Sequence, residues 1–466
     1  MNIGITLRRE LGRTLAIATP LILSSLLSMG IAITDVVMMA WLGSPVLAAG
    51  AAVSDFYSIL VYLVGGILGA LSAVLAESRG AGRDSDCAVW IAQSFRLALI
   101  MALPGALLIG AIPQLLQLIG AESEVVVAAG DYAPMLALTF VLLLLSRVWH
   151  QCFAAFEHTR TILGGMLISL PLNALGNYAL MNGHWGLPEL GLAGIGLSSV
   201  ICAATLLLWY SLQARRAHWY RPVARLLLCN DSLRRSKLLR LGVPIGVTCL
   251  GETGVFLLAT LLIAGFSLEE LAAHTLTLRV AGVLYAVPLG LSQAATVRAG
   301  LAFGAKDPAA MVRVLRIQLW LALLWGLPLV LLLLEGRELL TLWLLPDAGG
   351  RPALLETASL LLLLLALLQP ADNLATQVTG FLRGLQDTRR PMQLIICSQW
   401  LLALPLGLLL GHGAGLGATG IWLGLGSGVL LACAGLLLRL QPQLALASRR
   451  NAGPASAEPD PWQACA

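Results

Sequence analysis

Three acidic side chains lie inside long apolar stretches of the sequence: Asp35, Glu252 and Asp372. A carboxylate at the centre of a bilayer costs about 2.5–3.5 kcal/mol on insertion scales. None of the three has a Lys or Arg residue one helical turn away along the chain. We therefore expect each carboxyl group to face water, hold a proton or bind a cation. The alternative is a carboxyl group that only joins helices by hydrogen bonds.

A second set of candidate side chains is polar but uncharged. Asn173 and Asn177 are four positions apart, so they share one face of a helix. Ser198 and Ser199 follow a glycine-rich segment further along the chain. Carboxylate, amide and hydroxyl oxygens are the ligands that a hard monovalent cation needs in place of water. The pattern predicts a cation site, although the Asn pair is also typical of hydrogen bonds between closely packed helices.

Several kinds of chemistry are absent from the sequence. The two lysines, Lys237 and Lys306, do not follow a glycine, so the chain has no Walker A loop for ATP. No HExxH or GxSxG motif occurs, and the six His and eight Cys residues are scattered without metal-ligand spacing. We therefore predict no catalytic residues, no metal site and no cofactor. The protein is not expected to be an enzyme, and an ion gradient must drive any pumping.

The composition places these residues in a membrane protein. Of the 466 residues, 58% are hydrophobic and 11% are charged, against about 45–50% and about 25% in soluble domains. A crossing helix needs about 20 apolar residues, so the hydrophobic content allows about 13 crossings and no large soluble domain. The same values exclude a nucleic-acid-binding protein, and the bilayer itself is the expected partner.

Apolar stretches separated by short polar turns predict an all-α protein with twelve spans. With a cytoplasmic amino terminus, 25 of the 29 Lys and Arg residues fall on the cytoplasmic side, as the positive-inside rule requires. Both termini are therefore expected in the cytoplasm. The predicted spans start near Thr14, Val46, Cys87, Val125, Ile162, Gly191, Lys237, Leu271, Ala309, Pro352, Met392 and Leu416.

Internal similarity predicts two pseudo-symmetric six-helix bundles. Pro20 and Pro244 are each followed 60 residues later by a Gly-Ala pair, and GLAGIGL (191–197) resembles GATGIWL (417–423). Six helices per half give parallel repeats around an axis along the membrane normal, with a central cleft between them. The expected division is a first bundle, a cytoplasmic linker, a second bundle and a cytoplasmic tail, over residues 1–212, 213–236, 237–442 and 443–466.

At these positions the sequence resembles the multidrug and toxic compound extrusion (MATE) family, particularly its bacterial NorM-like branch. The first span carries ATPLILSSLLSMGIAITDVVM, and spans 5 and 6 carry LPLNALGNYALMNGHWGLPELGLAGIGLSS. In the second half, GVPIGVTCLGETGVF surrounds Glu252 and QPADNLATQVTGFLRGLQDTRRPM surrounds Asp372. The resemblance implies two bundles around a cleft in the bacterial inner membrane. It also implies export of cationic amphipathic compounds in exchange for Na⁺ or H⁺ by alternating access.

The resemblance also assigns a site. It implies that six side chains bind the coupling cation or the substrate: Asp35, Asn173, Asn177, Ser199, Glu252 and Asp372. Two departures leave the coupling ion open. Family members with an amino-half Na⁺ site carry a carboxylate where this chain has Asn177. Some NorM-like members carry a Tyr where this chain has Leu368.

The substrate is expected to meet an apolar cavity with few fixed polar contacts. The cavity candidates are Met38, Phe256 and Tyr285, although such side chains are also typical of packing or lipid contact. Arg279 either pairs with a carboxyl group of the second half or extends its guanidinium to the membrane interface.

Two other functions are alternatives to drug export. A lipid-linked oligosaccharide flippase of the same superfamily would need a cationic cleft, which only Arg96 and Arg279 support. An enzyme embedded in the membrane would need a clustered His and carboxylate site, which the sequence lacks. The sequence carries no sign of oligomerisation, so a monomer is expected.

Overall fold

The computed structural model describes residues 3–227 and 231–450. These residues form helices and connecting turns, and no β-strand occurs among them. The prediction of twelve spans is confirmed. Twelve helices in the described part of the chain are long and apolar enough to cross a membrane: Leu7–Trp41, Ser44–Gly80, Asp84–Leu118, Ser123–Ala155, Thr159–Asn182, Gly191–Arg216, Ser232–Ile263, Leu268–Gly304, Pro308–Leu344, Pro352–Gly384, Arg389–Gly413 and Gly417–Gln441.

The chain divides into two compact units. The amino-terminal unit contains residues 19–246, and the carboxyl-terminal unit contains residues 247–450 together with residues 3–18. Two helices contribute to both units, α1 (Ile3–Trp41) and α9 (Ser232–Ile263). Pro20 and Pro244, which the internal repeat relates, lie within three residues of the points where these helices change unit.

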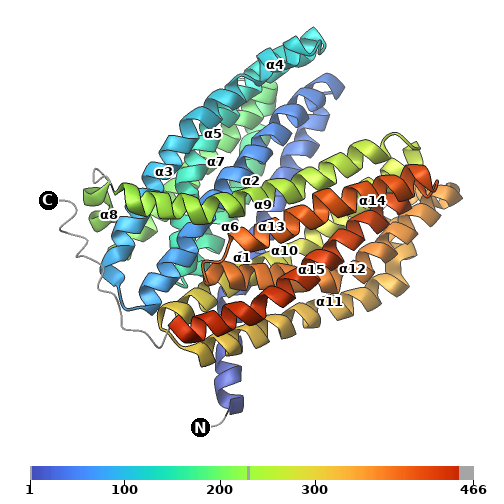
Figure 1. Ribbon diagram of the computed structural model, residues 1–466. Coiled ribbons are helices and arrows are strands. Elements are labelled where there is room, and N and C mark those ends of the chain that lie inside the picture. Colours follow the sequence, from blue (N-terminus) through green and yellow to red (C-terminus); the bar gives the residue numbers. More distant parts are fainter. Residues whose placement is uncertain (1–2, 228–230, 451–466) are drawn as a thin grey trace. The chain divides into compact units, whose positions relative to one another are not determined.

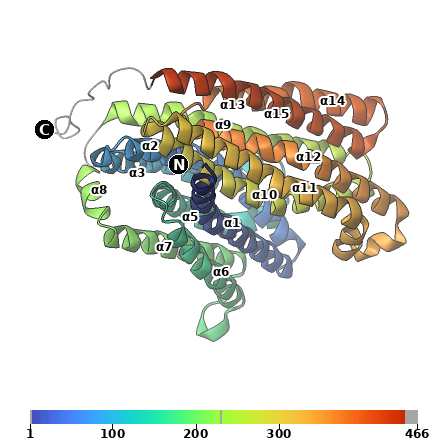
Figure 2. The ribbon, with the colours of Figure 1, turned by 90° about the horizontal axis from the view of Figure 1, so that it is seen from below.

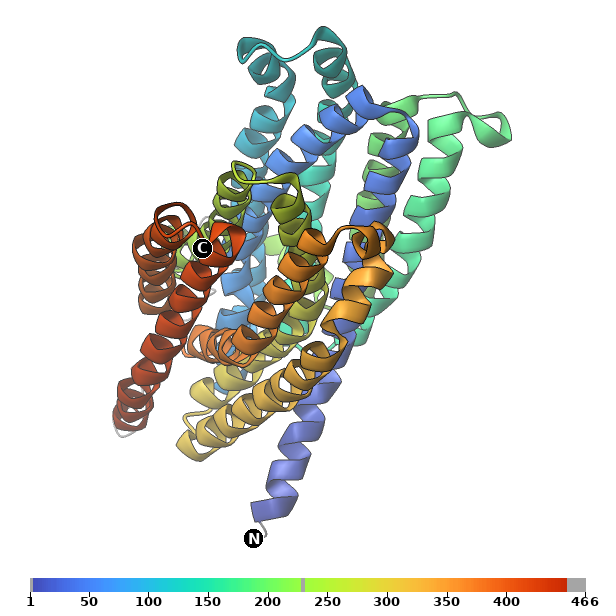
Figure 3. The ribbon, with the colours of Figure 1, turned by 90° about the vertical axis from the view of Figure 1, so that its right-hand side faces the viewer.

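The amino-terminal unit is built around α5, which packs against α2, α3 and α7. Figure 1 shows α3, α5 and α7 side by side. Figure 3 shows α6 alongside α7, joined by the loop that contains the short turn η1 (His184–Gly186). The helices of this unit, besides parts of α1 and α9, are α2 (Ser44–Gly80), α3 (Asp84–Gly110), α4 (Ile112–Leu118), α5 (Ser123–Ala155), α6 (Thr159–Asn182), α7 (Gly191–Arg216) and α8 (Tyr220–Leu226).

Small residues bring α6 and α7 close together. Gly183 ends α6 in the left-handed conformation with φ 69°, which glycine adopts without strain. A side chain at Gly194 would collide with the backbone at Leu180, so only glycine permits this approach. The Ser198 hydroxyl then donates a hydrogen bond to the backbone carbonyl of Asn173, 3.1 Å away. This contact holds the face of α6 that carries the Asn pair.

The carboxyl-terminal unit is built around α12, which packs against α10, α11 and α15. Figure 2 shows α11 and α12 running alongside one another. Ser267 and Asp307 cap the first turns of α10 and α11 by accepting hydrogen bonds from backbone N–H groups. Besides parts of α1 and α9, the unit contains α10 (Leu268–Gly304), α11 (Pro308–Leu344), η2 (Pro346–Gly350), α12 (Pro352–Gly384), α13 (Arg389–Ile396), the π-helical segment η3 (Cys397–Ala403), α14 (Leu404–Leu408), the π-helical segment η4 (Leu409–Gly413) and α15 (Gly417–Arg450).

Hydroxyl groups and glycines fix α10 against α12. The Ser292 hydroxyl donates to the Thr376 carbonyl at 2.9 Å, and the Thr296 hydroxyl lies 2.9 Å from the Gly380 carbonyl. A side chain at Gly380 would collide with the backbone of Ser292. Close backbone approach at small residues, supported by hydrogen bonds, is the usual way in which membrane helices associate.

Ion pairs attach the starts of α1 and α9 to the units in which they lie. In the carboxyl-terminal unit, the guanidinium of Arg298 donates to both carboxylate oxygens of Glu10 at 2.7 Å. In the amino-terminal unit, Arg234 pairs with Asp86 at 3.1 Å. Both pairs are largely shielded from solvent, so each is stronger than an ion pair on an open surface.

Some boundaries differ from those expected. Helix α1 begins at Ile3 rather than near Thr14, because the basic amino-terminal segment continues the helix. The segment 213–236, expected as a linker, contains α8 in its described part. Helix α15 continues to Arg450, beyond the expected start of the tail at 443, and residues 451–466 of that tail lie outside the described residues.

The contact between α10 and α12 is open to a direct test. We expect G380A to lower the free energy of unfolding by about 1–3 kcal/mol, because the added methyl group must push α10 away. The control is G65A on α2, where a methyl group meets no atom within 4 Å and helix propensity adds up to about 1 kcal/mol of stability. Thermal unfolding of the purified protein in detergent measures both. Equal stability of the two variants would contradict the proposed close contact.

Candidate functional site

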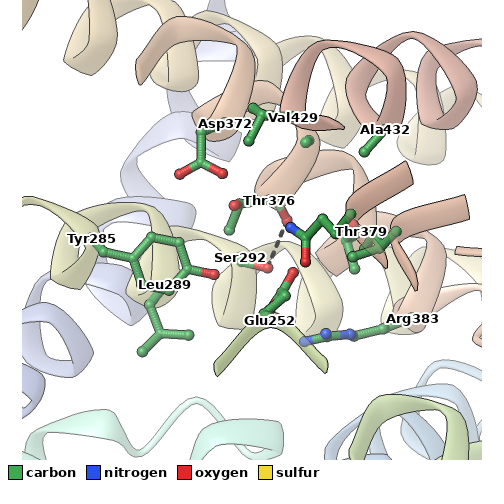
Figure 4. Close-up of a pocket in the computed structure, with 13 residues that line it drawn as sticks. Glu252, Tyr285, Leu289, Ser292, Asp372, Thr376, Thr379, Arg383, Val429 and Ala432 are labelled. Atoms are coloured by element: carbon green, nitrogen blue, oxygen red, sulfur yellow. Dashed lines mark hydrogen bonds between the residues drawn. The ribbon is translucent and has the colours of Figure 1, made fainter. Parts of the chain in front are cut away.

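A polar pocket lies within the carboxyl-terminal unit. Five elements contribute to it: α9, α10, α12, the segment from α13 into η3, and α15. Figure 4 shows its labelled side chains converging on one space between these helices. The lining residues are Glu252, Tyr285, Leu289, Ser292, Asp372, Ala375, Thr376, Thr379, Arg383, Ile395, Gln399, Val429 and Ala432.

Helical periodicity explains why the polar residues meet. On α12, Asp372, Thr376, Thr379 and Arg383 follow one another at intervals of four, three and four residues. Side chains at these intervals lie on one face of a helix, one above the other. On α10, Tyr285, Leu289 and Ser292 repeat the same spacing. The hydroxyl contacts between α10 and α12 then set the two faces against each other.

Glu252 is carried by α9, and the π-helical segment η3 holds this part of α9 in place. The indole of Trp400 donates a hydrogen bond to the carbonyl of Gly251, 3.2 Å away. A side chain at Gly251 would collide with Ile396, so α9 passes close to the end of α13. Residues adjacent to these anchors, Glu252 and Gln399, both line the pocket. π-Helical turns within α-helices often occur at functional sites.

The pocket offers oxygen atoms that have no hydrogen-bond partner in the described part of the chain. The Gln399 Oε1 and Thr379 Oγ1 atoms are buried without a hydrogen bond among the described residues. The carboxyl groups of Glu252 and Asp372 are half-buried, and neither forms an ion pair in the described part of the chain. Carboxylate, amide and hydroxyl oxygens of this kind suit a proton or a hard monovalent cation. The arrangement can therefore bind one of these in exchange for water.

A second cluster lies in the amino-terminal unit, around Asp35 of α1. The side-chain amides of Asn173 and Asn177 both donate to Asp35 Oδ1, at 3.0 and 2.6 Å. The other carboxylate oxygen, Oδ2, has no hydrogen bond among the described residues. The Oδ1 atoms of the two amides are buried and also lack a partner there. Three oxygen atoms thus remain for a cation, beside a carboxylate that two amide donors already stabilise.

The structure brings together some of the sequence-predicted residues and separates others. Tyr285 lines the pocket with Glu252 and Asp372. Ser199 makes no hydrogen bond among the described residues, and its neighbour Ser198 contacts Asn173 instead. Three further candidates do not line the pocket: Met38, which is buried in the amino-terminal unit, and Phe256 and Arg279, which are exposed.

Arg279 has no ion pair in the described part of the chain. The structure therefore does not contain the pairing with a carboxyl group that was one of the two expected alternatives. Arg279 is exposed on α10, and the other alternative, in which the guanidinium extends along the helix to the membrane interface, stays a prediction.

Of the residues that line the pocket, sequence reasoning named only Glu252, Tyr285 and Asp372, and the polar side chains that it missed include Arg383 and Gln399. It assigned Arg383 to the cytoplasmic loop after span 10, because the positive-inside rule treats each basic residue as a loop residue. The available signal was the spacing of 11 residues from Asp372, which is about three helical turns. Gln399 gave no such signal, since the π-helical turns that place it are not visible in the sequence.

Comparison with known proteins identifies relatives along nearly the whole chain. Residues 20–179 and 244–409, more than half of the chain, match the MatE family. The probable multidrug resistance protein NorM of Synechococcus sp. is 32% identical over 444 residues, which cover 93% of this chain and 94% of that protein. The probable multidrug resistance protein NorM of Bradyrhizobium diazoefficiens is 33% identical over 447 residues, 93% of each chain.

A solved structure has the same fold. The Vibrio cholerae MATE transporter VcmN in the bent form aligns with a TM-score of 0.86 at 18% identity, over 96% of this chain and 99% of that one. Together with the sequence relatives, this match confirms the family resemblance and the twelve-helix fold.

The geometry around Asp35 predicts the effect of a second carboxylate. In N177D, two carboxylates would face each other at the 2.6 Å separation of the present hydrogen bond, which requires a proton or a cation between them. We expect Na⁺ to raise the thermal unfolding temperature of N177D more than that of the wild type. At a Na⁺ concentration about 100 times the dissociation constant, Na⁺ binding adds about 2.7 kcal/mol to the free energy of unfolding.

The control for this measurement is N182D on the same helix, because Asn182 is exposed and its amide contacts only the Tyr178 carbonyl. Unfolding is followed in NaCl and in choline chloride at equal ionic strength. If N177D responds to Na⁺ no more than N182D does, the oxygen cluster at Asp35 cannot hold a cation as described.

Proposed function

This chain belongs to the MatE family of transporters, and from this premise we propose that it exports cationic amphipathic compounds in exchange for Na⁺ or H⁺. It is a multi-pass integral membrane protein whose relatives are named as multidrug resistance proteins. The observation that carries the proposal is the pair of carboxylates, Glu252 and Asp372, in a polar pocket between membrane-spanning helices. The proposed location is the bacterial inner membrane, with both termini in the cytoplasm as the distribution of Lys and Arg predicts.

Exchange follows if the coupling ion and the cationic substrate bind to the same carboxylates. A bound proton or Na⁺ neutralises Glu252 or Asp372 and removes the attraction for a cationic substrate. A bound cationic substrate disfavours the ion for the same reason, because binding free energies are coupled reciprocally. An apolar wall beside the carboxylates, such as Leu289 and Val429, can accept substrates of different shape.

Asp35 forms a second candidate site for the coupling ion. Its neighbours Asn173 and Asn177 are neutral, so the cluster carries a single negative charge when Asp35 is ionised. One proton or one monovalent cation neutralises it. Efflux by D35N, compared with efflux by E252Q and D372N, distinguishes which of the two sites drives transport. No cofactor other than the coupling ion is proposed.

Transport requires that these sites open to one side of the membrane at a time, and we propose alternating access between two conformations. The energy available is sufficient. One-for-one exchange of a monocation for Na⁺ or H⁺ moves no net charge, so the concentration gradient of the ion drives it, and a tenfold gradient supplies about 1.4 kcal/mol, which supports about tenfold accumulation. The proposed working unit is a monomer.

The carboxylates provide the first test. We expect D35N, E252Q and D372N, made singly, to lower the efflux of a fluorescent cation from energised cells. A loss of about tenfold corresponds to about 1.4 kcal/mol of binding or coupling energy. The control is E122Q, which removes an exposed carboxylate from the start of α5. Wild-type efflux in all three variants, with normal protein in the membrane, would contradict the proposal.

The coupling ion is tested in vesicles that contain the purified protein. Na⁺ and pH gradients are imposed separately, at zero membrane potential, and uptake of the fluorescent cation is followed. We expect uptake against the substrate gradient with one of the two ions and loss of that uptake when the gradient is dissipated. Uptake that depends on neither gradient would contradict exchange against Na⁺ or H⁺.

A further inference from the structure

Arg383 lies in the pocket together with the two carboxylates. Figure 4 shows its guanidinium beside Glu252, with Asp372 on the other side of the space. Among the described residues, no carboxylate lies within ion-pair distance of Arg383 and no hydrogen bond fixes it. The side chain is half-buried. Arg383 is therefore a positive charge that lies in the same pocket as two carboxylates and forms an ion pair with neither of them.

Two other arginines of the chain, Arg298 and Arg234, are held by ion pairs. Arg298 forms a bidentate ion pair with Glu10 at 2.7 Å, and Arg234 forms ion pairs with both Asp86 and Asp231. Arg383 differs because its guanidinium has no such partner and ends in a pocket that holds carboxylates. Its long side chain can therefore move toward Glu252 or away from it without breaking a hydrogen bond or an ion pair to another described residue.

The charges of the pocket can be counted. Its charged lining side chains are Glu252, Asp372 and Arg383, and Tyr285 is the remaining titratable one. Arginine stays protonated at any physiological pH. With both carboxylates ionised, the pocket carries one net negative charge rather than two. A single positive charge neutralises it.

We propose that Arg383 is an internal counter-ion that limits the pocket to one exchangeable positive charge. The guanidinium compensates Glu252 while the site is empty of cargo, and Asp372 provides the charge that cargo must neutralise. The site then takes one proton, one monovalent cation or one monocationic substrate, and it discriminates against dications. This inference rests on the proposed function, because it assumes that the pocket is the cation and substrate site.

The test compares a monocation with a dication of the same chemistry. Binding of radiolabelled tetraphenylphosphonium to the purified protein is measured by equilibrium dialysis, with a bis-phosphonium dication as competitor. We expect R383Q to shift the affinity ratio toward the dication by about tenfold, because the net charge of the pocket doubles. R383K, which retains the charge, should keep the wild-type ratio.

Two further variants separate charge from structure. The control R390Q removes an exposed guanidinium that contacts only Gln393, and it should behave as the wild type does. The double variant E252Q/R383Q restores one net negative charge, so its affinity ratio should return toward the wild-type value. A purely structural role of Arg383 would not produce this recovery.

The outcomes separate two claims, that Arg383 acts as a counter-ion and that the pocket is the cation site. A wild-type ratio in R383Q, or a shifted ratio in R383K, overturns the role of Arg383 as counter-ion. If D372N also weakens tetraphenylphosphonium binding in the same assay, the proposed function survives that failure. If D372N leaves binding unchanged, the pocket is not the cation site, and both the proposed site and this inference fail.

Discussion

Carboxylates within membrane-spanning helices need hydrogen-bond donors or positive charges to stabilise their negative charge. The rest of this structure depends on that constraint. Apolar surroundings give an ionised carboxyl group no stabilisation, so the protein must supply donors, charges or access to water. Asp35 receives two amide hydrogen bonds from α6. Glu252 and Asp372 share a polar pocket with Arg383. The helices that carry these groups must therefore meet at fixed faces, which the packing of each unit provides.

Small residues and hydroxyl groups provide those fixed faces. Where α10 meets α12, the hydroxyls of Ser292 and Thr296 contact carbonyl oxygens of the facing helix, and Gly380 allows the close approach. Where α6 meets α7, Ser198 and Gly194 act in the same way. Apolar contacts alone would not select one rotation of a helix in lipid, because lipid tails are as apolar as the side chains. The polar contacts select it.

The sequence predicted the parts of this arrangement that depend on a single helix. The number of spans follows from hydropathy, and the shared face of Asn173 and Asn177 follows from their spacing. The parts that depend on how one helix is rotated against another were not predictable. Ser198 rather than Ser199 contacts α6, a difference of one residue and about 100° of rotation. Phe256 lies one helical turn after Glu252 on the same side of α9, but it is exposed and does not line the pocket.

The two halves repeat in sequence but compensate their carboxylates by different means. Around Asp35 the compensating groups are neutral amides on short side chains of α6. In the pocket the compensating group is a full positive charge at the end of a long side chain of α12. A neutral donor stabilises a carboxylate without competing with a cation for its charge, whereas a guanidinium competes directly. The acidic residues of the two halves therefore need not have equal affinity for the same ion.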